Sequence, residues 1–170
     1  MTTSYKCLAL FLSVLAGGCA ISTPRNTVEG VSGLAGDHVL IVTVTEAHHA
    51  GVRQNRTEFW QQTRSVARDL GQQAGLVQYS LRREIFGTRA WTMTVWKDED
   101  SLNQFYWSPA HAEAMAQATA GLTGAKFARL YLRTDELASL SWSKALQALN
   151  NVELIKLIRK ELNTSMTWSC

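Results

Sequence analysis

The chain has 170 residues, of which 46% are hydrophobic and 18% are charged. This composition is typical of one folded domain with a packed core and excludes a disordered chain. The formal net charge is only +3, and no run of lysine and arginine with interleaved aromatic residues occurs. The sequence therefore argues against a nucleic-acid-binding protein.

The N-terminus has the layout of a secretory signal. Lys6 precedes the apolar run Cys7 to Leu15, and three small residues then lead to Cys19. The run is shorter than the roughly 20 residues that a bilayer-spanning helix needs. Residues 15–19 (LAGGC) resemble a bacterial lipobox, which implies a signal peptide over residues 1–18 and a lipidated Cys19. Leu15 stands one position earlier than the usual pattern, so cleavage by ordinary signal peptidase with a soluble product is the alternative.

The residues after Cys19 indicate which membrane would hold the lipid anchor and how the domain is spaced from that membrane. No Asp follows Cys19, and resemblance to the enteric sorting rule then implies the outer membrane, facing the periplasm. Residues 20–37 are rich in Gly, Ser and Thr and predict a flexible tether between lipid and domain. Cys170 at the C-terminus is expected to be an inert thiol, with an intermolecular disulfide as the alternative.

The folded part begins with a strand and a helix. Val39 to Val44 (VLIVTV) is a β-branched run that predicts a buried strand, and the following His48 and His49, with Glu46 nearby, are expected at its solvated end. Adjacent strand residues point to opposite faces, so the two histidines do not suggest a metal site. Apolar residues then recur at helical spacing from Thr57 to Gln73.

A hairpin is predicted between residues 77 and 96, and two loop lengths give two alternative strand registers. A two-residue loop at Gly87–Thr88 would pair Arg82 with Met93 and mix apolar with polar residues. A three-residue loop over residues 86–88 pairs Leu81 with Met93 and keeps each face uniform, so it is preferred. One face then combines Gln78, Ser80, Arg82, Thr92, Thr94 and Trp96.

Helix signals and a last strand complete the order of elements. Asp98 can cap a helix, Ser108 can cap a second one that starts at Pro109, and Lys126 to Arg133 alternates as a strand. The order β-α-β-β-α-β predicts an α+β, ferredoxin-like domain with an antiparallel sheet over residues 38–135. Residues 136–170 are expected to add an amphipathic helix from Trp142 to Leu162, with a break possible at Asn150–Asn151.

Residues 80–116 (SLRREIFGTRAWTMTVWKDEDSLNQFYWSPAHAEAMA) resemble the antibiotic biosynthesis monooxygenase-like family and, more faintly, the spheroidene-monooxygenase-like group. The features that carry this resemblance are the strand ending in Trp96, the acidic start of the next helix, and the segment from Phe105 to His111. The resemblance implies a dimeric α/β barrel whose subunits keep a pocket between sheet and helices. Alternation on both faces of the hairpin also predicts a homodimer, because one helix layer covers one face only.

The resemblance also leads to an expectation about haem. In the haem-degrading branch a tryptophan and a haem-ligating histidine stand at the positions of Phe105 and Met115, and this chain has neither residue there. We therefore expect no cofactor and no metal, with haem left open through His111.

His111 and Arg82 are the candidate catalytic residues. His111 lies near a helix start, where the positive end of the dipole favours neutral imidazole that can accept a proton. Its alternative is a structural histidine bonded to a carbonyl. Arg82 could steady an enolate or phenolate, or it could lie in a dimer interface. The candidate ligand-binding residues are Trp96, Thr94, Ser80 and Trp107.

Two functions remain from the sequence alone. The first is an oxygenase that acts on a small hydrophobic or phenolic compound, with His111 as proton acceptor and Arg82 beside the developing charge. The second is a non-catalytic envelope lipoprotein that binds a ligand or only assembles as a dimer.

Overall fold

The structure, a computed structural model, describes residues 20–51, 61, 64–65, 67–119, 121–152 and 155–156. The predicted signal peptide, Cys19 and Cys170 lie outside these residues. Within the described part of the chain, no helix is both long enough and apolar enough to cross a membrane.

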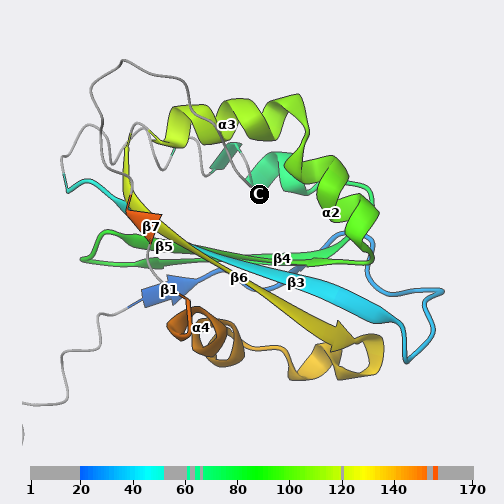
Figure 1. The fold of residues 1–170 in the computed structure, drawn as a ribbon. Coiled ribbons are helices and arrows are strands. Elements are labelled where there is room, and N and C mark those ends of the chain that lie inside the picture. Colours follow the sequence, from blue (N-terminus) through cyan, green and yellow to red (C-terminus); the bar gives the residue numbers. More distant parts are fainter. Residues whose placement is uncertain are drawn as a thin grey trace, which may run out of the picture.

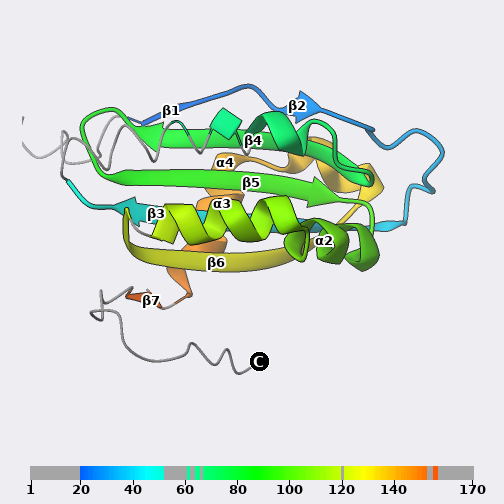
Figure 2. The ribbon, with the colours of Figure 1, turned by 90° about the horizontal axis from the view of Figure 1, so that it is seen from above.

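One antiparallel sheet forms the centre of the fold. Its strands are β1 (Ala20–Ser22), β2 (Asn26–Thr27), β3 (Val39–His49), β4 (Leu76–Glu84), β5 (Arg89–Trp96), β6 (Leu122–Arg133) and β7 (Ile155–Lys156). The spatial order is β1-β4-β5-β3-β6-β7, and β2 also pairs with β4. The order β4-β5-β3-β6 is that of a ferredoxin-like sheet, because β5 inserts between the two strands of the first β-α-β unit (Figure 2). The predicted fold class is confirmed.

Two predicted helix starts are confirmed. Helix α2 (Glu99–Tyr106) is capped by Asp98, whose carboxylate accepts the Ser101 N–H at 2.8 Å. Helix α3 (Pro109–Thr119) starts at proline, and the Ser108 hydroxyl accepts the His111 N–H at 3.2 Å. The described residues 67–70 of the first predicted helix are helical. A 3₁₀ helix, η1 (Thr134–Ser139), and helix α4 (Trp142–Asn150) follow β6.

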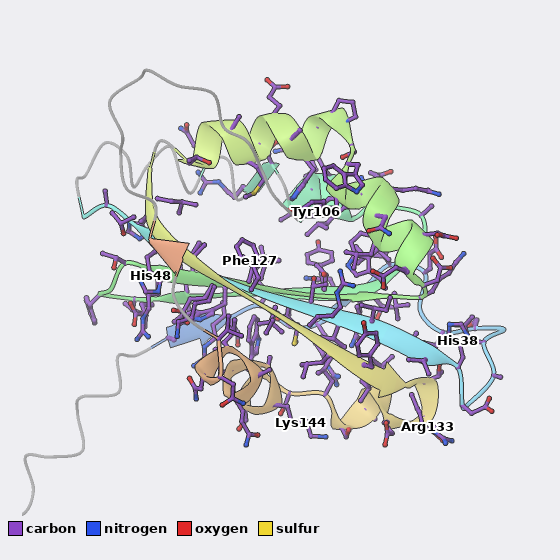
Figure 3. The ribbon with its side chains drawn as sticks, viewed as in Figure 1. His38, His48, Tyr106, Phe127, Arg133 and Lys144 are labelled. Atoms are coloured by element: carbon purple, nitrogen blue, oxygen red, sulfur yellow. The ribbon has the colours of Figure 1, made fainter. Side chains whose placement is uncertain are left out.

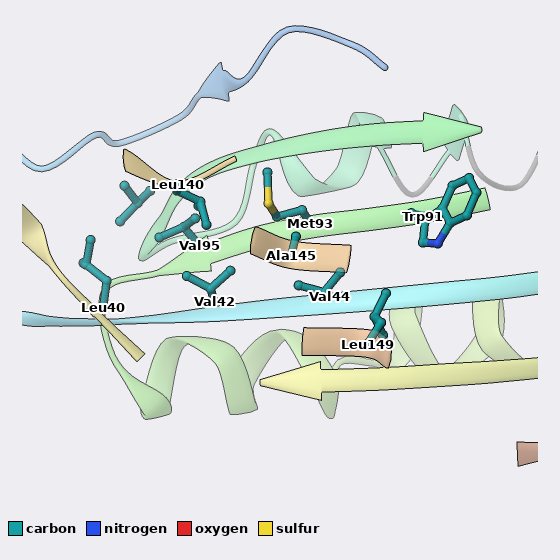
Figure 4. Close-up of a cluster of buried hydrophobic side chains, with 10 residues drawn as sticks. Leu40, Val42, Val44, Trp91, Met93, Val95, Leu140, Ala145 and Leu149 are labelled. Carbon is teal, nitrogen blue, oxygen red and sulfur yellow. The ribbon is translucent and has the colours of Figure 1, made fainter. Parts of the chain in front are cut away.

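The sheet is covered on both sides by this one chain. Helices α2 and α3 lie on one side and α4 lies on the other, which we call the α3 face and the α4 face (Figure 1). The α4 face carries the larger core, shown in Figure 4, whose members are Leu40, Val42, Val44, Val77, Trp91, Met93, Val95, Leu140, Ala145 and Leu149. The α3 face carries a second buried cluster of Ile41, Leu70, Leu76, Trp96 and Leu102.

The observed hairpin register corrects the predicted one. Leu81 pairs with Thr92 instead of Met93, and Arg82 pairs with Trp91, so the pairing is shifted by one residue from that of the preferred three-residue loop. The loop spans four residues, 85–88, and the Arg89 side chain closes it on the Glu84 carboxylate at 2.5 and 2.8 Å. The register was chosen on the assumption that each face is either apolar or polar throughout. That assumption is wrong here, because both faces of this sheet are covered and each accepts a mixture of apolar and polar residues.

The N-terminal segment is part of the domain rather than a free tether. Ala20 to Ser22 and Asn26 to Thr27 pair with β4, which would otherwise expose an open edge. The Val28 and Glu29 N–H groups donate to the carbonyls of Val77 and Leu76. The tether prediction failed because edge pairing uses backbone groups, which composition does not reveal.

The C-terminal region is also corrected. Helix α4 ends at Asn150, within the pair where a break was considered possible, and residues 155–156 form strand β7 on β6 instead of continuing the helix. Because α4 and η1 cover the second sheet face, the premise of the dimer prediction, that one helix layer leaves that face bare, is wrong for this chain.

Candidate functional site

Three rows of side chains cross the α3 face of the sheet. The row under α2 is buried and apolar, with Ile41, Leu76 and Trp96, and it ends at Tyr131. The next row contains Thr94 and Thr43, whose hydroxyls are 2.6 Å apart, and ends at Arg129. The third row contains Leu81, Thr92, Thr45 and Phe127. The α3 face thus joins aromatic rings to a band of threonine hydroxyls.

His111 lies above this face in the first turn of α3. The side chain is half-buried, and burial lowers the pKa of its imidazole below the usual value. The buried Nδ1 has no hydrogen-bond partner among the described residues. A neutral imidazole with an unused ring nitrogen can accept a proton. The catalytic role of His111 stays a prediction.

Aromatic rings connect His111 to the threonine band. The Phe105 ring centroid is 4.5 Å from that of His111 and 5.1 Å from that of Trp96. The indole N–H of Trp96 donates to the Thr94 hydroxyl at 2.8 Å. The Tyr106 ring lies 5.6 Å from His111 on its more exposed side. Figure 3 places Tyr106 and Phe127 on this side of the sheet.

Arg82 and Ser80 lie on the opposite face, away from His111. Ser80 is fully buried, donates to the Thr23 carbonyl at 2.9 Å and accepts the Trp142 indole N–H at 3.1 Å. The Arg82 guanidinium lies between the Trp91 and Trp142 rings, 5.8 and 6.0 Å from their centroids. The predicted polar face therefore splits in two. The cause is the one-residue register shift, which places Thr94 and Trp96 on the α3 face and Ser80 and Arg82 on the α4 face.

The remaining predicted ligand-binding residues differ in accessibility. Trp96 is 0% exposed and Thr94 is 4% exposed, so both support the site from beneath. Trp107, the C-cap of α2, is 75% exposed and packs edge-on against Tyr106. A ligand on the α3 face would meet Trp107 and Tyr106 before it could meet Trp96.

Three residues of β6 belong to this face and were not singled out from the sequence. Phe127, Arg129 and Tyr131 all project onto the α3 face and are exposed. Arg129 forms an ion pair with Glu99 at 2.5 Å, and a hydrogen bond with Tyr131 raises the pKa of its guanidinium, which stays charged. The alternation of residues 126–133 was visible, and only the unknown sheet order hid that these residues join Thr43.

The space beside His111 is small. A hollow of about 10 Å³, lined by Asp69, Gln73, Phe105, Ser108, Ala110, His111 and Ala114, holds at most one water molecule. A larger hollow of about 440 Å³ lies on the α4 face between the N-terminal segment and η1. None of the described side chains of α3 is fully buried.

The predicted solvated end of β3 is instead a buried polar cluster. Glu46 is 7% exposed and His49 is 2% exposed. The Glu46 carboxylate accepts the Trp91 indole N–H at 2.7 Å and lies 2.5 Å from the His48 ring nitrogen. Burial alone would raise the pKa of Glu46, but these hydrogen bonds and the charges of His48 and Arg89 outweigh it and lower the pKa. No group of three metal-ligating side chains occurs among the described residues.

Comparison with known proteins supports the fold. No family model and no curated protein matches the sequence. PA3566 from Pseudomonas aeruginosa is 15% identical, with a TM-score of 0.51 over 56% of this chain and 96% of that one. A candidate monooxygenase from Fusobacterium nucleatum is 19% identical, with a TM-score of 0.50 over 55% of this chain and 42% of that one.

A third solved structure, a candidate antibiotic biosynthesis monooxygenase from Caulobacter crescentus, is 16% identical, with a TM-score of 0.48 over 57% of this chain and 91% of that one. The first two of these structures confirm the expected α+β, ferredoxin-like fold over about 55% of the chain.

Proposed function

We propose that this chain is an envelope lipoprotein whose α3 face binds a small hydrophobic or phenolic compound, and that His111 accepts a proton from this compound in an oxygenase reaction. The observation that carries the proposal is the half-buried His111 packed against the Phe105 and Tyr106 rings, with its pKa lowered by burial. Aromatic walls suit an apolar or phenolic ligand, and a neutral imidazole suits proton abstraction at neutral pH.

The charge formed on the ligand needs a cation on the same face. Arg82 does not serve, because it lies on the α4 face with Trp91 and Trp142. We assign the role to Arg129, which stands in the row of Thr43 and Thr94. Dioxygen is the co-substrate of such a reaction, and neither a metal nor a haem group is required by the proton step.

Two experiments test this function: identification of a co-purifying ligand and measurement of turnover in a His111 variant. The purified chain is analysed by native mass spectrometry for a co-purifying small molecule, haem included, and any ligand found is then tested for turnover. His111→Gln should bind that ligand with similar affinity and should turn it over at least about 100-fold more slowly, the usual weight of a general base. Equal turnover in the variant would exclude His111 as the base.

A non-catalytic binding protein is the second candidate function. It is favoured by the hollow of about 440 Å³ on the α4 face, which is far larger than the hollow of about 10 Å³ beside His111 and lies on the opposite side of the sheet from it. Unchanged ligand affinity in His111→Ala, with no turnover by the wild-type chain, would support this reading over the oxygenase.

The lipid anchor is tested separately. Cys19→Ser should abolish incorporation of a labelled fatty acid and should release the chain from the envelope fraction. Wild-type chain that carries no acyl mass would indicate the soluble alternative left open by the position of Leu15.

A homodimer remains part of the proposal, but not through the α4 face as it stands. Leu140, Ala145 and Leu149 already bury that face against the sheet. A dimer compatible with this packing would have to use a surface other than the α4 face.

A further inference from the structure

The residue that follows the proposed lipid anchor in the sequence lies at one end of the sheet. Strand β1 begins at Ala20, which directly follows Cys19 in the sequence, and Ala20 pairs with Glu84, the last residue of β4. Consecutive Cα atoms are about 3.8 Å apart, and paired residues in antiparallel strands are about 4.5–5.5 Å apart. Pairing therefore fixes Ala20, which a single peptide bond joins to the proposed lipid anchor, beside Glu84 at the hairpin end of β4.

The hairpin loop that follows Glu84 presents an apolar side chain to the outside. Phe86 is 90% exposed, more than any other large hydrophobic side chain in the described part of the chain. Ile21 of β1, which pairs with Arg83, is 47% exposed at the same end. In Figure 2, β1 lies along the edge of the sheet beside β4, starting at the hairpin end and running away from it.

The loop is held in one shape, so Phe86 is displayed on a defined turn. The Glu84 carboxylate accepts the Arg89 backbone N–H at 3.2 Å and its guanidinium at 2.5 and 2.8 Å. Gly87 packs directly on this carboxylate, where an added Cβ would overlap Glu84.

The charges at this end suit an anionic surface. Arg82, Arg83 and Arg89 lie on the two hairpin strands, against two carboxylates, Glu46 and Glu84. The excess is basic, and basic residues beside a membrane anchor are attracted to anionic lipid headgroups. Interfacial amphipathic helices likewise combine basic residues with Trp, Phe or Leu, and the hairpin end presents the same combination with Phe86 and the arginines.

We propose that Phe86 and Ile21, flanked by Arg83 and Arg89, form a membrane-docking surface that contacts the same bilayer as the lipid on Cys19. The inference rests on the proposed lipid anchor. It fixes the orientation of the domain: this end of the sheet meets the membrane, and the α3 and α4 faces stand beside it, both open to the periplasm.

Spin labelling of the full-length, lipidated chain in vesicles of phosphatidylethanolamine and phosphatidylglycerol tests this orientation. Cys170→Ser removes the remaining free thiol, because Cys7 lies in the signal peptide and Cys19 carries the lipid. A nitroxide is then attached at Phe86→Cys or, as the matched control on an exposed aromatic position far from this end, at Tyr131→Cys. Collision rates are measured with dioxygen, which partitions into lipid, and with a water-soluble nickel complex.

The proposal predicts that dioxygen is favoured over the nickel complex several-fold more at position 86 than at position 131. Water-like collision rates at both positions, on chain that stays bound to the vesicles, would overturn the docking surface and leave the anchor intact. Dipolar broadening at position 86 would show that a second copy covers the surface instead. Chain without acyl mass that fails to bind vesicles would overturn the anchor and, with it, this proposal.

Discussion

His111 differs from the chain's three other histidines in what surrounds its ring. His38 is bonded to the Lys97 carbonyl at 2.7 Å, His48 pairs with Glu46, and His49 lies 3.2 Å from the Ala50 carbonyl. The contacts of the His111 ring are with Phe105 and Tyr106. A histidine held by rings rather than by a carboxylate keeps its neutral form, as a base near neutral pH requires.

The pH dependence of turnover follows from the lowered pKa of His111. The base works in its unprotonated form, so the rate should rise with pH through that pKa and level off above it. Since burial lowers the pKa of His111 below its usual value of about 6.5, the acid limb of the profile should be centred below that value. The profile of kcat/KM against pH measures this, and an acid limb centred above 6.5 would contradict the burial argument. His111→Gln should remove the limb.

Trp91 supports a buried charge at the other end of the sheet. Trp91→Phe keeps the ring in the core but removes the N–H that donates to Glu46, which should lower the free energy of unfolding by about 1–3 kcal/mol. Trp107→Phe, at a 75% exposed position, is the control and should change stability by less than about 0.5 kcal/mol. Urea unfolding of both variants compares them.

The same substitution should change the acid stability of the protein. The pKa of Glu46 is lowered in the folded state, so its contribution to stability is present above the unfolded pKa and is lost as pH falls through the folded pKa. With one donor removed, the folded pKa rises towards the usual value and the contribution becomes smaller. An unchanged dependence of unfolding on pH between 3 and 6, the range around the ordinary glutamate pKa, would show that Trp91 does not hold this charge.

At the scale of elements, helix α4 replaces a partner on the second sheet face. Leu149 is 1% exposed and packs in the same cluster as Leu40, Val42 and Val44. Leu149→Ala should therefore cost about 2–5 kcal/mol of stability, whereas Gln147→Ala on the exposed side of the same helix should cost little. Similar midpoints of thermal unfolding for the two variants would mean that α4 is not bound to the sheet in solution.

The elements that the sequence predicted well are those with local signals. Asp98 and Ser108 are side-chain caps, and the alternation in β5 and β6 is a property of neighbouring residues. The hairpin register depended instead on a four-residue loop closed by Arg89 and Glu84, a contact between side chains that patterning does not encode. The edge pairing of Ala20 and Asn26 depended on backbone groups alone.

The difference between local signals and long-range contacts also explains which parts of the candidate site could be predicted. His111 was found because a proline and a serine mark the start of α3. The predicted hairpin register was wrong by one residue and so put Arg82 on the same face as Thr94. Arg129 was missed because only the order of strands in the sheet brings it next to Thr43. Long-range pairing, not residue chemistry, limited the prediction.

For the whole molecule, the chain completes both layers of its own fold. The solved structures cover about 55% of the chain, and α4, which closes the α4 face, comes after the expected ferredoxin-like domain of residues 38–135. We therefore expect that removing residues 141–170 would expose the apolar cluster and drive the chain to associate. Sedimentation of the full and shortened chains would compare them, and a shortened chain that stays monomeric would contradict this role of α4.

The most direct test of the proposed function is dioxygen consumption by the purified chain with a panel of mono- and polycyclic phenols, measured for wild type and for His111→Gln with matched secondary structure. With His111 as the base, uptake should depend on one class of phenol and should fall at least about 100-fold in the variant. Equal uptake by both proteins would contradict the role of His111. No uptake by the wild type, on a chain that binds a phenol of the panel, would contradict the oxygenase and leave a ligand-binding protein.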